Sequence, residues 1–381
     1  MNRRQFARVS FSLAMLALFA ASTGRAEDFV PSTKGKKLIA SGWHIPSPTY
    51  VRDHIAEMEK LPFNGLILGT CYPFWSKCRN GGAALDELVT NVSATHFQKF
   101  KDNFLGVESG NDNTFDWFDA PRCEELARNW KAIARAAKKA GMVGLKFDPE
   151  CYEGPSPFEY SKQPQRKTKS GREYADRVAK VAAQVIRAIN EEYPDVTILF
   201  YFGPSVGGHR RNLEGWCGLV PPFIDGMLSE ARSGLKIVDG YEQAYAYRTE
   251  KQYQAARATI KRQAALTPGL ATAFEKHVQA GFAIWPDAWS GPWRSQRKSW
   301  NADDPLKNFY TPDELAYATH NALKYSDQYV WMWAESLNFW QGWGWVYHKP
   351  DDRREQRPIP AAYVQALARA KQPTVSPPPK R

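Results

Sequence analysis

The sequence of 381 residues has few cysteines and no cluster of metal-binding side chains. Its five cysteines are dispersed and odd in number, which excludes a disulfide scaffold and leaves at least one thiol without a partner in the chain. They stand at Cys71, Cys78, Cys123, Cys151 and Cys217. No cysteine or histidine pair has the spacing of a zinc site. The sequence therefore predicts no metal site and no cofactor.

Long apolar runs are also missing. The apolar run at residues 11–21 is too short to span a bilayer. It follows Arg3-Arg4 and precedes Gly24-Arg25-Ala26, which together give the three-part pattern of a secretory signal. We predict that residues 1–26 are an export signal, removed to leave a periplasmic or secreted protein without a membrane span. An uncleaved anchor is the alternative, and the arginine pair leaves both the general and the twin-arginine export routes open.

Basic residues are in excess but are not concentrated. The chain has 51 Lys and Arg against 40 Asp and Glu, a net charge of +11. Because these charges are scattered, with no basic helix or arm, the sequence predicts no nucleic-acid partner. It retains a mild preference for acidic surfaces or polymers.

Short apolar segments alternate with amphipathic ones along the chain, which is typical of a parallel α/β fold. We expect eight strands, at residues 38–43, 65–69, 103–108, 142–148, 197–202, 235–242, 282–287 and 329–335. Helix-start signals at Ser47, Asp119, Thr249 and Thr311 lie between them. We therefore predict a single (β/α)8 TIM barrel over residues 27–373, with extended loops at the C-terminal face of the strands. Residues 374–381 are expected to form a disordered, proline-rich tail.

An open, doubly wound sheet is the competing fold. Such a sheet normally carries a glycine-rich phosphate turn after an early strand. The one glycine-rich loop, at residues 203–208, follows the fifth expected strand and lacks both the G-x-G-x-x-G and the G-K-[ST] spacing. This absence favours the barrel.

Carboxylates follow four of the expected strands. Asp148 and Glu150 end the fourth, Glu242 the sixth, Asp287 the seventh and Glu335 the eighth. In a barrel these ends meet at one face, where active sites lie. Charged side chains are costly inside a barrel unless they are paired or used. We therefore select Asp148, Glu150, Glu242 and Glu335 as candidate catalytic residues.

Tryptophan is concentrated near the same strand ends. Nine of the fourteen lie at or beyond residue 285: Trp285, Trp289, Trp293, Trp300, Trp331, Trp333, Trp340, Trp343 and Trp345. Flat indole faces suit the C–H faces of sugar rings, although the same residues could instead pack loops against the barrel. The candidate carbohydrate-binding residues are His44, Tyr201, Tyr241, Trp285, Asp287, Trp333, Asn338 and Trp340.

Carboxylates and aromatic residues at a barrel mouth resemble the secreted TIM-barrel glycoside hydrolases, over about residues 38–370. Lys146-Phe147-Asp148 is similar to the Lys-x-Asp motif of α-galactosidase-like barrels, in which the aspartate is the nucleophile. This sequence departs from that pattern by adding Pro149-Glu150. It also lacks the Asn-Glu pair that marks strand four of many retaining β-glycosidases, so no stereochemistry is carried over. The resemblance implies cleavage of glycosidic bonds by two carboxylates.

Residue roles follow from the expected surroundings of each acid. Tyr241, Tyr245 and Tyr247 should desolvate Glu242 and keep it protonated, as a general acid requires. Lys146, on the same side of its strand as Asp148, should help to keep that carboxylate ionised as nucleophile or base. The alternatives are that these acids serve as caps and hydrogen-bond anchors, and that the barrel binds carbohydrate without cleaving it. The sequence does not indicate an oligomeric state.

Overall fold

The computed structural model describes residues 29–42, 45–110, 115–151, 156–267, 269–288, 301–335, 337, 339–340 and 359–379. The predicted export signal lies outside these residues. Contacts divide the chain into a short unit, Met1–Ser32, and a large one, Thr33–Arg381. The large unit carries all the helices and strands considered below.

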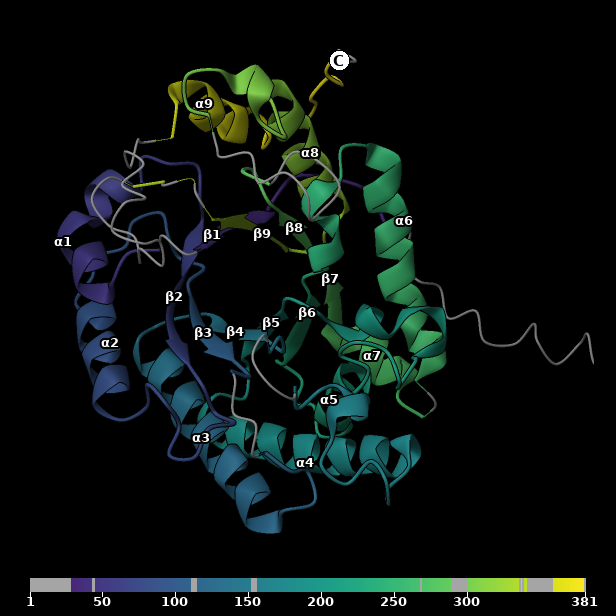
Figure 1. Cartoon of the computed structure of the whole chain (residues 1–381). Coiled ribbons are helices and arrows are strands. Elements are labelled where there is room, and N and C mark those ends of the chain that lie inside the picture. The colour runs from purple at the N-terminus through teal and green to yellow at the C-terminus, as the bar shows by residue number, and fades with distance from the viewer. Residues whose placement is uncertain are drawn as a thin grey trace, which may run out of the picture. The chain divides into compact units, whose positions relative to one another are not determined.

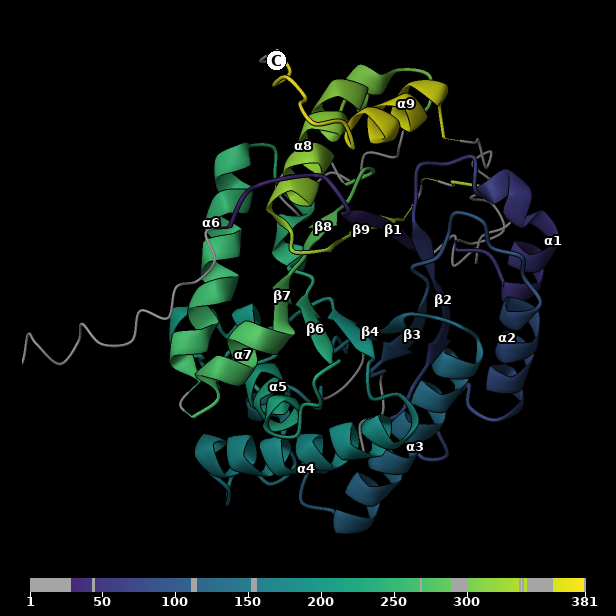
Figure 2. The same ribbon diagram turned by 180° about the vertical axis from the view of Figure 1, so that it is seen from behind.

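A ring of parallel strands forms the centre of the large unit (Figures 1 and 2). The strands are β1 (Lys37–Gly42), β2 (Gly65–Cys71), β3 (Phe104–Glu108), β4 (Gly144–Asp148), β5 (Thr197–Phe200), β6 (Lys236–Asp239), β7 (Val278–Ala280), β8 (Phe282–Ile284) and β9 (Tyr329–Ala334). Their order is β7-β6-β5-β4-β3-β2-β1-β9-β8, and every neighbouring pair is parallel.

The ring closes through a strand that is split at Gly281. Before this glycine, β7 pairs with β6, and after it β8 pairs with β9. The Gly281 N–H donates to the Asp239 carbonyl at 2.8 Å. A Cβ at position 281 would lie 2.7 Å from the Val238 side chain and 3.0 Å from the Tyr329 carbonyl, so the chain needs glycine where it passes from β7 to β8. Because β7 and β8 form one barrel strand, the predicted (β/α)8 architecture is confirmed.

Helices cover the outside of the ring (Figure 1). They are α1 (Pro48–Met58), α2 (Ala83–Ser93), α3 (Ala120–Lys139), α4 (Gly171–Glu192), α5 (Val220–Ser229), α6 (Glu250–Lys261), α7 (Ala271–His277), α8 (Pro312–Tyr325) and α9 (Ala361–Arg369). The predicted caps are present: Ser47 and Asp119 accept backbone N–H groups of α1 and α3, and Thr249 and Thr311 form capping boxes. Short 3₁₀ helices, including η2 (Pro204–Arg210) and η3 (Glu242–Ala246), follow β5 and β6.

Among the described residues, no helix is both long enough and apolar enough to cross a bilayer.

The barrel interior changes character along its axis. Near the strand starts it is filled by apolar side chains such as Ile39, Ile67 and Phe104. Near the strand ends, β4 carries Lys146 and Asp148 on alternate positions, which places both on the inner side. A polar layer of this kind, above an apolar plug, is the framework on which the site is built.

Candidate active site

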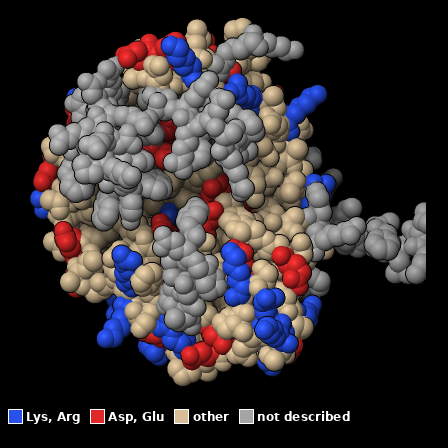
Figure 3. Space-filling view, viewed as in Figure 1, with Lys and Arg blue, Asp and Glu red and all other residues tan. Residues whose placement is uncertain are grey.

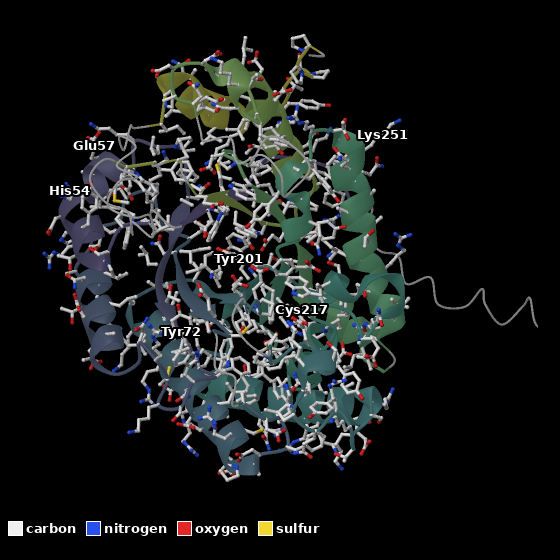
Figure 4. All side chains as sticks on the ribbon, viewed as in Figure 1. His54, Glu57, Tyr72, Tyr201, Cys217 and Lys251 are labelled. Atoms are coloured by element: carbon white, nitrogen blue, oxygen red, sulfur yellow. The ribbon has the colours of Figure 1, made fainter. Side chains whose placement is uncertain are left out.

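The floor of the site is a stacked pair of aromatic rings. Tyr201 and Trp331 are parallel within 3°, with ring centroids 3.6 Å apart. The Trp331 indole N–H donates to the Gly240 carbonyl at 2.8 Å, which ties β9 to the end of β6 across the barrel. A Cβ at position 240 would lie 2.8 Å from that indole nitrogen, so glycine is required there. Tyr201, a predicted site residue, lies at the centre of the barrel (Figure 4).

A buried lysine lies on this aromatic floor. Lys146 Nζ is 4.4 Å from the centroid of the Tyr201 ring and 3.2 Å from Glu108 Oε1. Only 4% of the lysine side chain is exposed, against 32% for Glu108. On the far side, the Tyr201 hydroxyl shares a hydrogen bond with Ser41 Oγ. Glu108 and Ser41 were not among the predicted site residues, although Glu108 ends an expected strand and Ser41 lies within one.

Asp148 occupies the position above Lys146 on β4. Its Oδ1 accepts the Glu150 N–H at 2.9 Å, so the carboxylate also caps the turn through Pro149. Burial raises the pKa of Asp148 to about 6, while Lys146 acts to lower it and Glu108 to raise it. The expected influence of Lys146 is therefore present, but desolvation outweighs it.

Glu242 reaches the site from a helical turn rather than from a strand. β6 ends at Asp239, three residues earlier than the strand predicted to end at residue 242. The strand ends because Asp239 accepts the N–H groups of Tyr241 (3.1 Å) and Ser205 (2.9 Å), and Tyr241 adopts a left-handed conformation with φ +42°. Glu242 then opens η3, and its N–H donates to the Tyr201 carbonyl at 3.2 Å.

The charge state of Glu242 is set by its neighbours. The pKa of this half-buried carboxyl is raised well above its usual value, first by desolvation and then by the negative charges of Glu150 and Asp148. Lys146 and a hydrogen bond from Tyr245 act in the opposite direction. Desolvation is thus present, but like-charge repulsion adds to it, and Tyr245 acts to lower the pKa rather than to raise it.

Glu150 is the third acid of the site, because its negative charge helps to raise the pKa of Glu242. It is half-buried, and its carbonyl accepts a hydrogen bond from Ser109 Oγ at 2.6 Å. Asp148 at the end of β4, Glu150 two residues later and Glu242 at the start of η3 therefore lie close enough for their charges to interact. Acidic atoms are visible near the centre of the face seen along the barrel (Figure 3).

Asp287 and Glu335 are joined to each other by a different contact. The buried Asp287 carboxylate accepts the N–H groups of Glu335 (3.1 Å) and Leu337 (2.6 Å). This geometry gives Asp287 the anchoring role that was the alternative to substrate binding. Glu335 is half-buried directly after β9, at the same end of the barrel as the three acids.

The predicted aromatic platform is largely buried where it is described. Trp285 is 8% exposed and packs on Tyr245, with ring centroids 5.4 Å apart. Trp333 is half-buried and meets Tyr201 edge to face at 6.3 Å. These two tryptophans support the floor, and Trp333 borders the site.

Two predicted binding residues lie elsewhere. Tyr241 points toward the helical layer, where it contacts Tyr247 and Phe282, because the left-handed turn directs it away from Glu242. Trp340 is 5% exposed and packs among Phe63 and Phe100, which precede β2 and β3. Both assignments are corrected, since neither side chain faces the acids. His44 and Asn338 lie outside the described residues, as do Trp289, Trp293, Trp300, Trp343 and Trp345.

The arrangement can hold a proton and a negative charge side by side. Burial raises the pKa of Asp148 to about 6, and desolvation together with two neighbouring acids raises the pKa of Glu242 well above its usual value. Pairs of acids with separated pKa values are suited to acid–base chemistry at one bond. In the described part of the chain, no three His, Cys, Asp or Glu side chains are grouped so that they could hold a metal ion.

Comparisons with known proteins indicate the fold. No family model and no curated protein sequence matches the chain. Among solved structures, the exo-beta-1,4-mannosidase Op5Man5 from Opitutaceae bacterium strain TAV5 is similar with a TM-score of 0.50 and 13% identity, covering 90% of this chain and 59% of that one. The glycoside hydrolase family 5 enzyme PbGH5A from Prevotella bryantii B14 gives 0.48 and 12%, covering 90% and 99%. D-psicose 3-epimerase from Clostridium cellulolyticum H10 gives 0.44 and 12%, covering 88% and 98%.

Proposed function

We propose that the protein is an exported glycoside hydrolase that cleaves glycosidic bonds in a polysaccharide or oligosaccharide. Glu242 is the general acid, and a β4 carboxylate, Asp148 before Glu150, is the nucleophile or base. The observation that carries the proposal is that Glu242 lies desolvated beside two further acids at the barrel mouth, which raises its pKa well above the usual value. Glycosidases need one carboxyl group that keeps its proton and one that has lost it.

The proposed proton donor and the proposed ionised carboxylate come from separate parts of the barrel. The half-buried Glu242 can give its proton to the leaving oxygen of a sugar that enters the mouth. Asp148, oriented by the Glu150 N–H at 2.9 Å, presents a carboxylate to the anomeric carbon or to a water. Lys146 lies beneath both acids and lowers the pKa of each. The charge of Lys146 is balanced by Glu108, and this ion pair holds the lysine against the Tyr201 ring.

The similarity to Op5Man5 supports the proposal at the level of the barrel. That protein is an exo-beta-1,4-mannosidase, but a shared fold at 13% identity does not transfer a substrate. The sugar, the linkage and the position of cleavage along the substrate must be identified by experiment.

The direct test is a screen of the purified mature protein against β-glucan, xyloglucan, β-mannan, xylan and α-galactoside substrates, with reducing-end release as the readout. Parent hydrolysis that Glu242→Gln abolishes, with binding retained, supports the proposal. Binding to a saccharide that the parent leaves intact would favour the non-catalytic carbohydrate-binding barrel.

Export is proposed on the sequence pattern of residues 1–26. Expression of the full chain in a bacterium, followed by mass spectrometry of the periplasmic and medium fractions, should show a protein beginning at Glu27. An intact N-terminus in those fractions would contradict cleavage after Ala26.

A further inference from the structure

One exposed aromatic ring stands at the end of the barrel that carries the acids. Trp216 is 45% exposed, and the other exposed large apolar residues of the described chain, Val30 and Leu306, are aliphatic. All the other tryptophans of the described residues are buried or half-buried. An exposed indole is therefore the exception in this structure.

The place of Trp216 links it to the site. It lies in the loop between η2 and α5, after β5, at the end of the barrel that carries the acids. The next residue, Cys217, is fully buried and lies within the electrostatic influence of Glu150, Asp148 and Glu242. The indole therefore stands on the rim, in the loop after β5, and the residue next to it lies within the electrostatic influence of the acids.

The indole is held in position by its surroundings. Its ring meets Phe202 edge to face, with centroids 4.6 Å apart and an angle of 86°, and Phe202 belongs to the apolar core of the barrel. Backbone hydrogen bonds from Gly215 to Asn212 (3.2 Å) and from Gly218 to Gly215 (3.0 Å) fix the turns on either side. A Cβ at Gly218 would lie 2.5 Å from the Leu213 carbonyl, so the loop packs closely on itself. A ring held in this way loses little entropy when a ligand binds.

We propose that Trp216 forms a stacking subsite for a pyranose ring, next to the ring whose bond is cleaved. An exposed apolar face at the edge of a polar site offers a surface that the C–H face of a sugar can cover. Because the acids define where the bond is cleaved, a ring on Trp216 belongs to a neighbouring unit of the same chain. The inference rests on the proposed function and deepens it: the substrate is an oligosaccharide or polysaccharide rather than a simple monosaccharide glycoside.

The test compares two substrates of the sugar that the screen identifies, its tetrasaccharide and its 4-nitrophenyl monosaccharide glycoside. Trp216→Ala should lower kcat/KM for the tetrasaccharide about tenfold, mainly through KM, because it removes a contact of the size of one aromatic pair. Hydrolysis of the 4-nitrophenyl glycoside should not change. Trp216→Phe, which keeps a flat ring, should retain most of the parental KM. Leu306→Ala, the matched loss of an exposed apolar side chain, should leave both substrates unaffected.

The outcomes separate the subsite from the proposed function. If the parent hydrolyses a saccharide and Trp216→Ala leaves its tetrasaccharide kinetics unchanged, the subsite is wrong and the hydrolase stands. Equal losses on both substrates, together with a lower Tm, would assign Trp216 a structural role and overturn the subsite. If the parent hydrolyses nothing, the proposed function fails and the subsite falls with it.

Discussion

Acids at the two ends of the barrel have pKa values that are shifted in opposite directions. Where β9 begins, Asp327 pairs with Arg257 and Lys261, each at 2.7 Å, and accepts the Ala280 N–H. Its pKa is lowered even though burial acts to raise it. Where β4 ends, burial raises the pKa of Asp148 to about 6, although Lys146 acts to lower it.

The difference lies in the number of cations for each acid. Asp327 forms ion pairs with two, whereas Asp148 and Glu242 share the field of Lys146, which is itself paired with Glu108. The first arrangement stabilises the fold when the acid is charged. The second costs stability when its acids are charged, and in return it keeps protons available near neutral pH. Substitutions at the two ends should therefore have different effects on activity and on stability.

The largest effect is expected at Glu242. Glu242→Gln keeps the shape of the side chain but removes its transferable proton, so turnover should fall by about 10²–10⁴-fold on a substrate that the parent cleaves. Glu314→Gln is the matched control, because Glu314 is buried beside Arg248 at 2.9 Å and glutamine can also complete its capping box. It should leave turnover unchanged. Near-parental turnover of Glu242→Gln would remove Glu242 from the mechanism.

Loss of charge at the other end should affect stability instead. Asp327→Asn leaves Arg257 and Lys261 without their common partner, and it should lower the free energy of unfolding by about 3 kcal/mol. Urea denaturation at pH 7.5 measures the change. A neutral effect would show that the two cations find other partners and that the contrast between the ends is weaker than the structure implies.

The same substitution at Asp148 should have the opposite sign. The folded pKa of about 6 lies above the ordinary value of 3.8, so the folded state binds the proton more tightly than the unfolded state does. Ionisation therefore costs stability, from pH 3.8 upward and fully above pH 6. Asp148→Asn should raise the free energy of unfolding at pH 7.5 by about 3 kcal/mol. The gain should disappear below pH 3.8, where both states are protonated, and equal gains at pH 3 and 7.5 would contradict this account.

The smallest predicted effect is a shift of the pH profile. The acid limb of kcat/KM should lie near pH 6, because the β4 carboxylate must be ionised. Lys146→Met removes the cation that lowers this pKa, so the limb should move up by about one pH unit. Lys146→Arg keeps the charge and should keep the limb in place. A limb that stays near pH 6 in the methionine variant would show that Lys146 does not set the ionisation of Asp148.

Most of the barrel could be predicted because each strand is a short apolar segment and several helices carry side-chain caps. All eight expected strands are present. α2, α5 and α7 were not predicted, because they have no side-chain hydrogen bond at their N-caps. In α5 most residues are buried, so no polar face marks its period. β7 was missed because it has only three residues and is separated from β8 by one glycine.

The site was harder to predict because it depends on turns and on long-range packing. The expected end of strand six was wrong since Asp239 stops the strand by capping a left-handed turn, an event that strand propensity does not reveal. Glu108 ends the third expected strand, as the selected acids end theirs, but its part in the site is seen only in its contact with Lys146. Trp340 and Trp216 carry the same side chain, yet one is buried and the other is on the rim, and only the tertiary fold distinguishes them.

Closure of the ring has a consequence for the order of folding. β1 pairs with β9 in the register Lys37 to Tyr329, which joins residues about 290 positions apart in the sequence. A chain still being synthesised cannot form this pair until nearly all of it has emerged, and until then the edge of β1 has no strand partner on that side. Unpaired edges invite association with other chains. A chain that stops before β9 should therefore aggregate, and recruitment of holding chaperones should end only when the last strand has been inserted.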